Sequence, residues 1–99
     1  MVQQPYYSEW QQVLDLVKQA VQQEQHEMLL TMLMTPDERD ALIARVNIVH
    51  ELLSGEMSQR QISQMLGVGI ATITRGSNEL KSRSDEEKAA LIELLTPPK

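Results

Sequence analysis

Apolar residues recur at helical spacing along most of the chain, and short polar breaks divide the pattern into segments. No segment shows the strict alternation of apolar and polar residues that is typical of a half-buried strand. The expected helices cover about Glu9–Gln22, His26–Leu33, Pro36–Ser54, Gln59–Leu66, Ile70–Lys81 and Asp85–Leu95. The pattern therefore predicts an all-α fold of six short helices.

Capping signals mark where four of these helices begin. In each case a Ser or Thr is followed three residues later by Glu or Gln, which is the spacing of a capping box. The pairs are Ser8 with Gln11, Thr35 with Glu38, Ser58 with Gln61, and Ser84 with Glu87. Pro36 also suits the first helical position, because its φ is already helical. Gly55 and the pair Pro97-Pro98 are expected to end the third and the last helix.

Four of the helices carry an apolar stripe that predicts the buried face. The stripes comprise Trp10, Val13, Leu14, Val17 and Val21; Leu42, Val46, Val49, Leu52 and Leu53; Ile62, Met65 and Leu66; and Ile73, Ser77 and Leu80. The segment His26–Leu33 is apolar on several sides and is predicted to be a short, deeply buried helix. Ala44 and Ile48 lie outside the stripe of the long third helix, so this helix is expected to be covered on more than one side.

The segment Met57–Lys81 organises the rest of the chain. Its two short helices are joined by Gly67-Val68-Gly69, a tight turn in which glycine can adopt positive φ. The second helix has an outer face of Ala71, Thr74, Arg75 and Asn78, which are small or polar with one arginine. This arrangement is typical of a helix-turn-helix whose second helix enters a DNA major groove. An ordinary αα-hairpin in a helical bundle remains the alternative.

Charge and composition narrow the possible functions. The 99 residues carry a formal net charge of −5 and contain no cysteine, which excludes disulfides and thiolate metal sites. Residues 58–83 are nevertheless net basic, with Arg60, Arg75, Lys81 and Arg83 against Glu79 alone. No apolar run approaches the roughly 20 residues that span a bilayer. We expect a cytoplasmic protein without a membrane segment.

The supply of large core side chains is small. The chain has no Phe, one Trp and two Tyr, and its apolar residues are divided among several short helices. A chain of this length buries only about two-thirds of its surface on folding. We therefore expect a second copy of the chain to complete the core.

Arg45 and Gly76 are out of place in these patterns. Arg45 lies within the apolar stripe of the third helix, so either its head extends to water or it meets an anionic ligand. Gly76 lies inside a helix, where glycine costs about 1 kcal/mol relative to alanine, so something packs closely there, either a neighbouring helix or a ligand. Arg75 and Glu79 are spaced for an ion pair on the helix surface.

Catalytic and metal-site motifs are missing from the sequence. His26 and His50 have no metal-ligand spacing and are expected at the surface. No nucleophile motif and no phosphate-binding loop is present, so we expect no enzymatic activity.

The segment Thr35–Lys81 strongly resembles the bacterial tryptophan repressor family. The motifs TPDER, GEMSQR and GIATITRGSN carry the resemblance, which covers nearly half of the chain without a break. It implies an intertwined homodimer that binds palindromic operator DNA of tryptophan biosynthesis genes, with L-tryptophan as corepressor. The implied organisation is a flexible arm over residues 1–8 and one helical domain over residues 9–99. Within that domain, residues 9–55 and 84–96 would form the dimerisation core and residues 58–81 the helix-turn-helix.

The resemblance also implies a set of ligand-binding residues. Arg45 and Arg75 would sandwich the indole ring, and Arg75 would also meet the ligand carboxylate. Val49 and Gly76 would line the ring, whereas Thr35 and the backbone carbonyls of Met32 and Met34 would come from the partner chain. The best-known member of the family has serine, near the ligand ammonium, at the position of Glu79. The Glu79 carboxylate can pair with that ammonium or compete for Arg75.

Candidate DNA contacts follow from the exposed side of the two-helix segment. The second helix offers Ile70, Ala71, Thr72 and Thr74 to the bases, with the threonines acting mostly through water. Arg60 is the best candidate for a direct guanine contact. Gln59, Lys81 and the backbone at Gly67 are expected to serve phosphates. The alternative function is a tryptophan-repressor-like helix-turn-helix protein with a different ligand or none.

Overall fold

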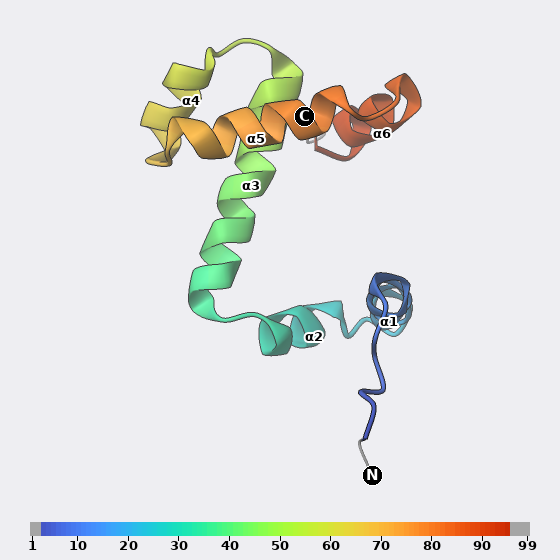
Figure 1. The fold of residues 1–99 in the computed structure, drawn as a ribbon. Helices are drawn as coiled ribbons and strands as arrows, with labels where there is room; N and C mark the ends of the chain where they lie inside the picture. The colour runs from blue at the N-terminus through green and yellow to red at the C-terminus, as the bar shows by residue number, and fades with distance from the viewer. Residues whose placement is uncertain (1–2, 96–99) are drawn as a thin grey trace. The chain divides into compact units, whose positions relative to one another are not determined.

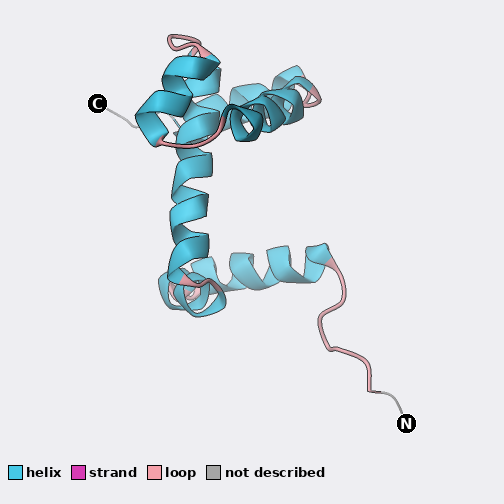
Figure 2. Cartoon of the chain, turned by 60° about the vertical axis from the view of Figure 1, so that its left-hand side comes forward, coloured by secondary structure: helices cyan, strands magenta, loops and turns pink. Residues whose placement is uncertain are grey.

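The structure is a computed structural model that describes residues 3–95. Every regular element in that range is a helix (Figures 1 and 2). The helices are α1 (Trp10–Gln22), α2 (His26–Leu33), α3 (Pro36–Ser54), α4 (Gln59–Leu66), α5 (Ile70–Lys81) and α6 (Asp85–Leu95). The all-α prediction is therefore confirmed. The proline pair that was expected to end the last helix lies outside the described residues.

Three of the four predicted capping boxes form. In α3 the Thr35 N–H donates to the Glu38 carboxylate at 2.8 Å, and the Glu38 N–H donates to the Thr35 hydroxyl at 3.2 Å. The same reciprocal pairs join Ser58 with Gln61 and Ser84 with Glu87. These bonds satisfy backbone groups that have no partner within the first turn of a helix.

The cap predicted for the first helix is wrong by one residue. The helix begins at Trp10 with Glu9 as N-cap, so Ser8 is not the capping residue. The side-chain oxygen of Gln12 accepts the N–H groups of Ser8 and Glu9, at 2.8 and 3.0 Å. Gln11 instead donates to Asp15 at 2.9 Å. Adjacent glutamines offer the same capping chemistry in two registers, and the sequence pattern does not choose between them.

The chain divides into an N-terminal unit, up to Arg39, and a C-terminal unit, from Asp40 onward. In the N-terminal unit α1 packs against α2, and Arg39 donates to the Thr31 carbonyl at 3.2 Å. Ala20 is the only buried residue that is described in this unit. Most of its apolar surface is therefore not covered within the single chain.

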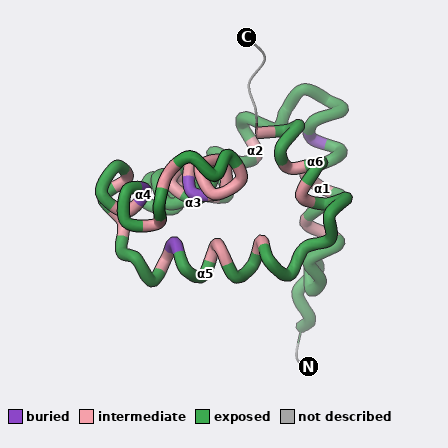
Figure 3. The backbone as a smooth tube through the Cα atoms, turned by 90° about the horizontal axis from the view of Figure 1, so that it is seen from above, coloured by how far each residue is buried: buried purple, intermediate pink, exposed green. Residues whose placement is uncertain are grey.

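The core of the C-terminal unit forms where α3, α4 and α5 meet. Ile48, Ile62 and Ile73, one from each helix, form one buried cluster. Figure 3 colours the chain by burial and shows how little of it is buried. Leu52, Met57, Leu66 and Val68 pack around the three isoleucines and are partly buried. This cluster fixes α4 and α5 against the C-terminal half of α3, and it holds the turn between them in place.

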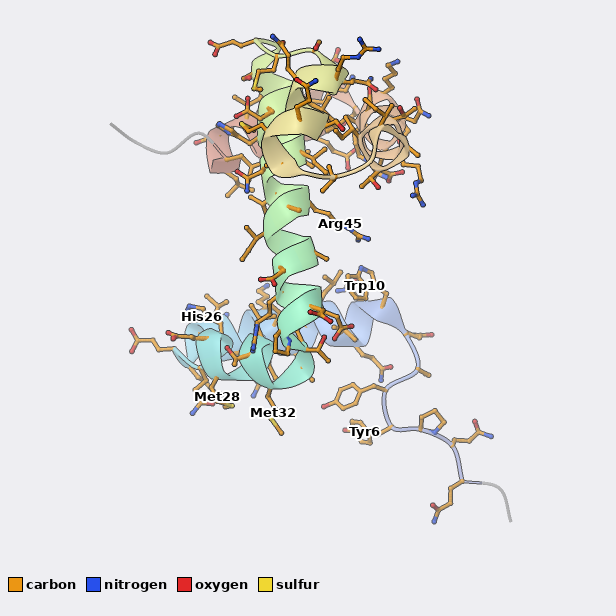
Figure 4. All side chains as sticks on the ribbon, turned by 90° about the vertical axis from the view of Figure 1, so that its left-hand side faces the viewer. Tyr6, Trp10, His26, Met28, Met32 and Arg45 are labelled. Atoms are coloured by element: carbon orange, nitrogen blue, oxygen red, sulfur yellow. The ribbon has the colours of Figure 1, made fainter. Side chains whose placement is uncertain are left out.

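Several burial predictions are wrong for the single chain. α2 contains no buried residue, and Met28 and Met32 project from it into solvent (Figure 4). Leu42, Val46 and Met65, which were assigned to buried stripes, are also exposed, as are Trp10, Leu14 and Val21. Ile48 is the buried residue of α3, although it lies outside the predicted stripe. Helical spacing identifies an apolar face, but it does not say what covers that face.

The described part of the chain contains no helix that is both long enough and apolar enough to cross a membrane.

Candidate functional site

A cavity of about 460 Å³ opens within the C-terminal unit. α3 lines it with Arg45, Ile48 and Val49, and α5 lines it with Thr72, Arg75, Gly76, Glu79 and Leu80. Arg83 and Leu91 complete the lining. The residues from α5 are three to four positions apart, so they share one face of the helix. The cavity therefore combines an apolar wall with three arginines and one carboxylate.

Five of the predicted ligand residues meet in this cavity: Arg45, Val49, Arg75, Gly76 and Glu79. Arg45 is exposed and extends away from the α3 backbone (Figure 4). The guanidinium of Arg45 is therefore open to water in the free chain, so the protein pays no desolvation cost for an unpaired buried charge. From there it can reach a bound molecule.

The three predicted ligand residues assigned to a partner chain belong to the N-terminal unit. Met32 closes the last turn of α2, and Met34 is the residue that caps its C-terminus. Thr35 engages both its N–H and its hydroxyl in the α3 capping box. None of the three lines the cavity within this chain.

Gly76 has a packing role as well as a place in the lining. A Cβ at this position would lie 3.3 Å from Ile48 Cγ2 and 3.7 Å from Leu52 Cδ1. Real Cβ atoms are rarely found as close as the first distance. The glycine therefore permits α5 to approach α3 closely, which was one of the two explanations that the sequence left open.

Glu79 pairs with a different arginine from the one suggested by the sequence. The Arg83 guanidinium donates to the Glu79 carboxylate and lies 3.6 Å from Glu87 Oε2. None of the described carboxylates forms an ion pair with Arg75. The hydrogen bond and the charge of Glu79, followed by the charge of Glu87, raise the pKa of Arg83 above its usual value.

Sequence reasoning did not identify Ile48, Leu80, Arg83 and Leu91 as parts of the site. A signal for Arg83 was present, because Arg75, Glu79 and Arg83 follow one another at intervals of four residues. Thr72 was assigned to the DNA-facing side, yet it is half-buried and lines the cavity. Nothing in the helical pattern identifies Leu91, because α6 meets the cavity through tertiary packing.

The α4–α5 head, residues 58–81, presents most of the predicted DNA contacts to solvent. Arg60, Ile70, Ala71, Thr74 and Lys81 are exposed, and Gly67 adopts the left-handed conformation at the end of α4 with φ +69°.

Two hydrogen bonds organise this head. Thr74 Oγ1 donates to Gln59 Oε1 at 3.1 Å, which links α5 to α4. Ser63 Oγ donates to the Val68 carbonyl at 2.6 Å and closes the turn. These bonds link α4, the turn and α5, and one face of α5 remains exposed.

The two histidines have different surroundings. His26 is exposed as expected, but His50 is half-buried, with Nδ1 3.0 Å from the Leu95 carbonyl oxygen, so it joins α3 to α6. Residues 3–95 contain no group of three or more His, Cys, Asp or Glu side chains that could hold a metal ion.

Known proteins resemble this chain over most of its length. Residues 8–95 match the family model described as "Trp repressor protein". The chain is 89% identical over 98 residues to the "Trp operon repressor homolog" of Vibrio cholerae, covering 99% of this chain and 95% of that protein. It is 76% identical over 95 residues to the protein of the same name from Vibrio vulnificus, covering 96% and 93% of the two chains. For the one from Aliivibrio fischeri the identity is 71% over 89 residues, with 90% and 82% covered. The chain therefore belongs to the Trp repressor family.

Proposed function

We propose that this chain is an L-tryptophan-dependent transcriptional repressor, which binds palindromic operator DNA of tryptophan biosynthesis genes as a homodimer. The observation that carries the proposal is that the two faces of α5 have different surroundings. One face of this helix lines a ligand-sized cavity, and the other face is exposed at the α4–α5 head.

The lining of the cavity suits an aromatic α-amino acid. A planar guanidinium stacks well on an aromatic face, and Arg45 and Arg75 reach the cavity from different helices. An indole between them would gain two such contacts, with Val49 against its edge. The remaining donor capacity of Arg75 suits the ligand carboxylate, and the Glu79 carboxylate suits the ammonium.

The exposed apolar surface supports the homodimer. Met32 is 81% exposed and Trp10 is 71% exposed, and Met28, Ile43 and Leu94 are similarly uncovered. Monomeric proteins rarely leave this much apolar surface in water, and a second copy of the chain would cover it. In the dimer, Thr35 and the carbonyls of Met32 and Met34 would come from the partner to meet the polar end of the ligand.

The proposed DNA contacts divide into base contacts and phosphate contacts. Arg60 would read a guanine through O6 and N7, while the exposed residues Ile70, Ala71 and Thr74 at the start of α5 would lie against the bases. Lys81, Gln59 and the Gly67 backbone would hold phosphates. The hydrogen bond from Thr74 to Gln59 supports this division, because it fixes the start of α5 relative to a phosphate-binding residue.

A ligand in the cavity would favour one position of α5. Arg75 and Gly76 belong to the lining, so a bound molecule would restrain the helix that faces DNA. A ligand shifts a conformational equilibrium only by its difference in affinity for the two states. L-tryptophan would therefore tighten DNA binding to the extent that it binds the DNA-competent position better.

Calorimetry with L-tryptophan and its decarboxylated analogue tryptamine tests this function. We expect one L-tryptophan per chain, with much weaker binding of tryptamine because it has no carboxylate to pair with Arg75. Operator DNA should bind more tightly when L-tryptophan is present. A protein that binds operator DNA equally well with and without L-tryptophan would contradict the proposal.

A further inference from the structure

Arg83 is an arginine of the cavity to which the proposed function gives no role. It lies just after the end of α5, and its backbone N–H donates to the Leu80 carbonyl at 3.0 Å. Its guanidinium reaches back to Glu79 and forward to Glu87 of α6. Arg83 therefore stands between two carboxylates, one of which lines the cavity.

Glu79 has two possible arginine partners, each four residues away. Arg75 precedes it on α5, and Arg83 follows it just after the end of that helix. A carboxylate that is N-terminal to its cation at this spacing makes the better pair, because both charges then agree with the helix dipole. The structure shows this preferred pairing, in which Glu79 turns toward Arg83.

The second contact of Arg83 adds a constraint. Glu87 is held by its capping box with Ser84, and its carboxylate lies near the other terminal nitrogen of the guanidinium. Two carboxylates on different nitrogens restrict how the guanidinium can rotate. Glu79 is thereby held at the solvent edge of the cavity, with 69% of its side chain exposed.

We propose that Arg83 is a positioning residue that sets ligand specificity: by holding Glu79, it leaves Arg75 available for the carboxylate of the ligand. The inference rests on the proposed function, because it assumes a ligand that carries a carboxylate. Without Arg83, the Glu79 carboxylate would pair with Arg75 and compete with that ligand. L-tryptophan would lose less than an analogue without an ammonium group, because its ammonium can still draw Glu79 away.

The test measures two ligands, L-tryptophan and indole-3-propionate, on the full-length protein by calorimetry. Arg83→Ala should weaken L-tryptophan binding by about two- to fivefold, the range of an exposed ion pair. The loss for indole-3-propionate should be larger. Arg83→Lys should restore both affinities, because lysine retains the charge. In a Glu79→Gln background, Arg83→Ala should change neither affinity.

Glu86→Gln is the matched control. It removes an exposed carboxylate from the first turn of α6 that forms no ion pair with Arg83 in the described structure, so both affinities should stay near those of the parent. An equal loss for both ligands, in the Glu79 parent and in the Glu79→Gln background, would overturn the inference. It would mean that Arg83 acts on the ligand directly or only supports the fold. Unchanged binding by Arg83→Ala would also overturn it.

The Nε–Hε resonance of Arg75, followed by proton–nitrogen NMR without ligand, separates this inference from the proposed function. We expect the resonance to move in Arg83→Ala and to return in the double variant with Glu79→Gln. If the parent binds no L-tryptophan but the resonance behaves in this way, the assignment of L-tryptophan as corepressor is wrong. The inference that Arg83 keeps Glu79 away from Arg75 would still hold. If the resonance stays in place in Arg83→Ala, the inference fails whatever the ligand is.

Discussion

Gly76 shows how a single missing methyl group can determine helix packing. A Cβ at this position would lie 3.3 Å from Cγ2 of Ile48, which is almost fully buried, so Ile48 would have to shift to admit it. A β-branched side chain in a helix has one strongly preferred rotamer, which makes such a shift costly. The glycine in the middle of α5 is therefore explained by contact with α3, without reference to a ligand.

Gly76→Ala should destabilise the protein. Alanine gains about 1 kcal/mol in helix propensity, but overpacking a core costs about 1–3 kcal/mol. The net effect expected in chemical denaturation is a lower midpoint. Adding Ile48→Leu, which removes the Cγ2 methyl, should recover part of the loss. A higher midpoint for Gly76→Ala alone would show that Ile48 can move.

Arg75 and Arg45 should contribute unequally to L-tryptophan binding. Arg75→Ala removes both a ring contact and the carboxylate partner, so its affinity should fall by at least about tenfold. Arg45→Ala should cause a smaller loss, because one face of the indole remains covered. Lys18→Ala, which removes an exposed cation on α1, should bind like the parent in the same calorimetric titration. If both arginine variants also bind like the parent, the cavity is not the ligand site.

At the scale of single elements, the ends of helices were the most predictable features. Three capping boxes follow directly from the sequence, because their partners are only three residues apart. The positive φ of Gly67 also follows directly, because it depends on the glycine itself. The start of α1 was missed because Gln11 and Gln12 are chemically the same. The site was less predictable: Leu91 and Ile48 reach the cavity through packing between helices, which has no short-range signal.

The capping carboxylates should give the protein a measurable acid sensitivity. The N–H of Thr35, and then its hydroxyl, lower the pKa of Glu38, and Ser84 does the same for Glu87. Stabilisation from a lowered pKa is present above the ordinary carboxyl pKa and is lost as pH falls through the folded-state value.

Glu38→Gln tests this effect, because glutamine caps the helix but does not titrate. The parent should unfold at a higher temperature than the variant at neutral pH, and the difference should narrow as the pH is lowered below about 4. Circular dichroism melts at one fixed protein concentration would measure it. A difference that stays constant with pH would show that the Glu38 charge does not stabilise α3.

Arg60 and Lys81, on the two helices of the head, should affect DNA binding in different ways. Lys81→Ala should weaken binding to every sequence alike and reduce the salt dependence by about one unit. Arg60→Ala should cost about 1–3 kcal/mol and relax the preference at one base pair in each half-site. Titrations on a set of operator variants at several salt concentrations compare them. A uniform loss for Arg60→Ala would make Arg60 a phosphate contact.

For the whole molecule, the sequence pattern predicted which helix faces are apolar, but it did not predict what covers them. Leu42, Val46 and the methionines of α2 form regular stripes, yet they are exposed in the single chain. An interface between two chains would bury them, and such an interface leaves no separate signal in the spacing of residues. The scarcity of large core side chains was the one feature of composition that pointed to a second copy.

The thermal midpoint should therefore rise with protein concentration, because unfolding and dissociation would be coupled. Melts over a hundredfold concentration range, combined with the mass in solution, provide the test. Ile43→Glu, on the exposed side of α3, should lower the midpoint and the mass, whereas Glu56→Gln in the loop after α3 should change neither. A monomer mass with a constant midpoint would refute the dimer.

The division of α5 into two faces has a consequence for how such regulators diversify and how they could be engineered. Thr72, Gly76 and Leu80 face the cavity, whereas Ala71, Thr74 and Asn78 face outward. In the proposed repressor, a library randomised at 71, 74 and 78 would yield new operator preferences that still respond to the same metabolite. Arg75 is exposed and also lines the cavity, so it is the position that such a library should leave unchanged.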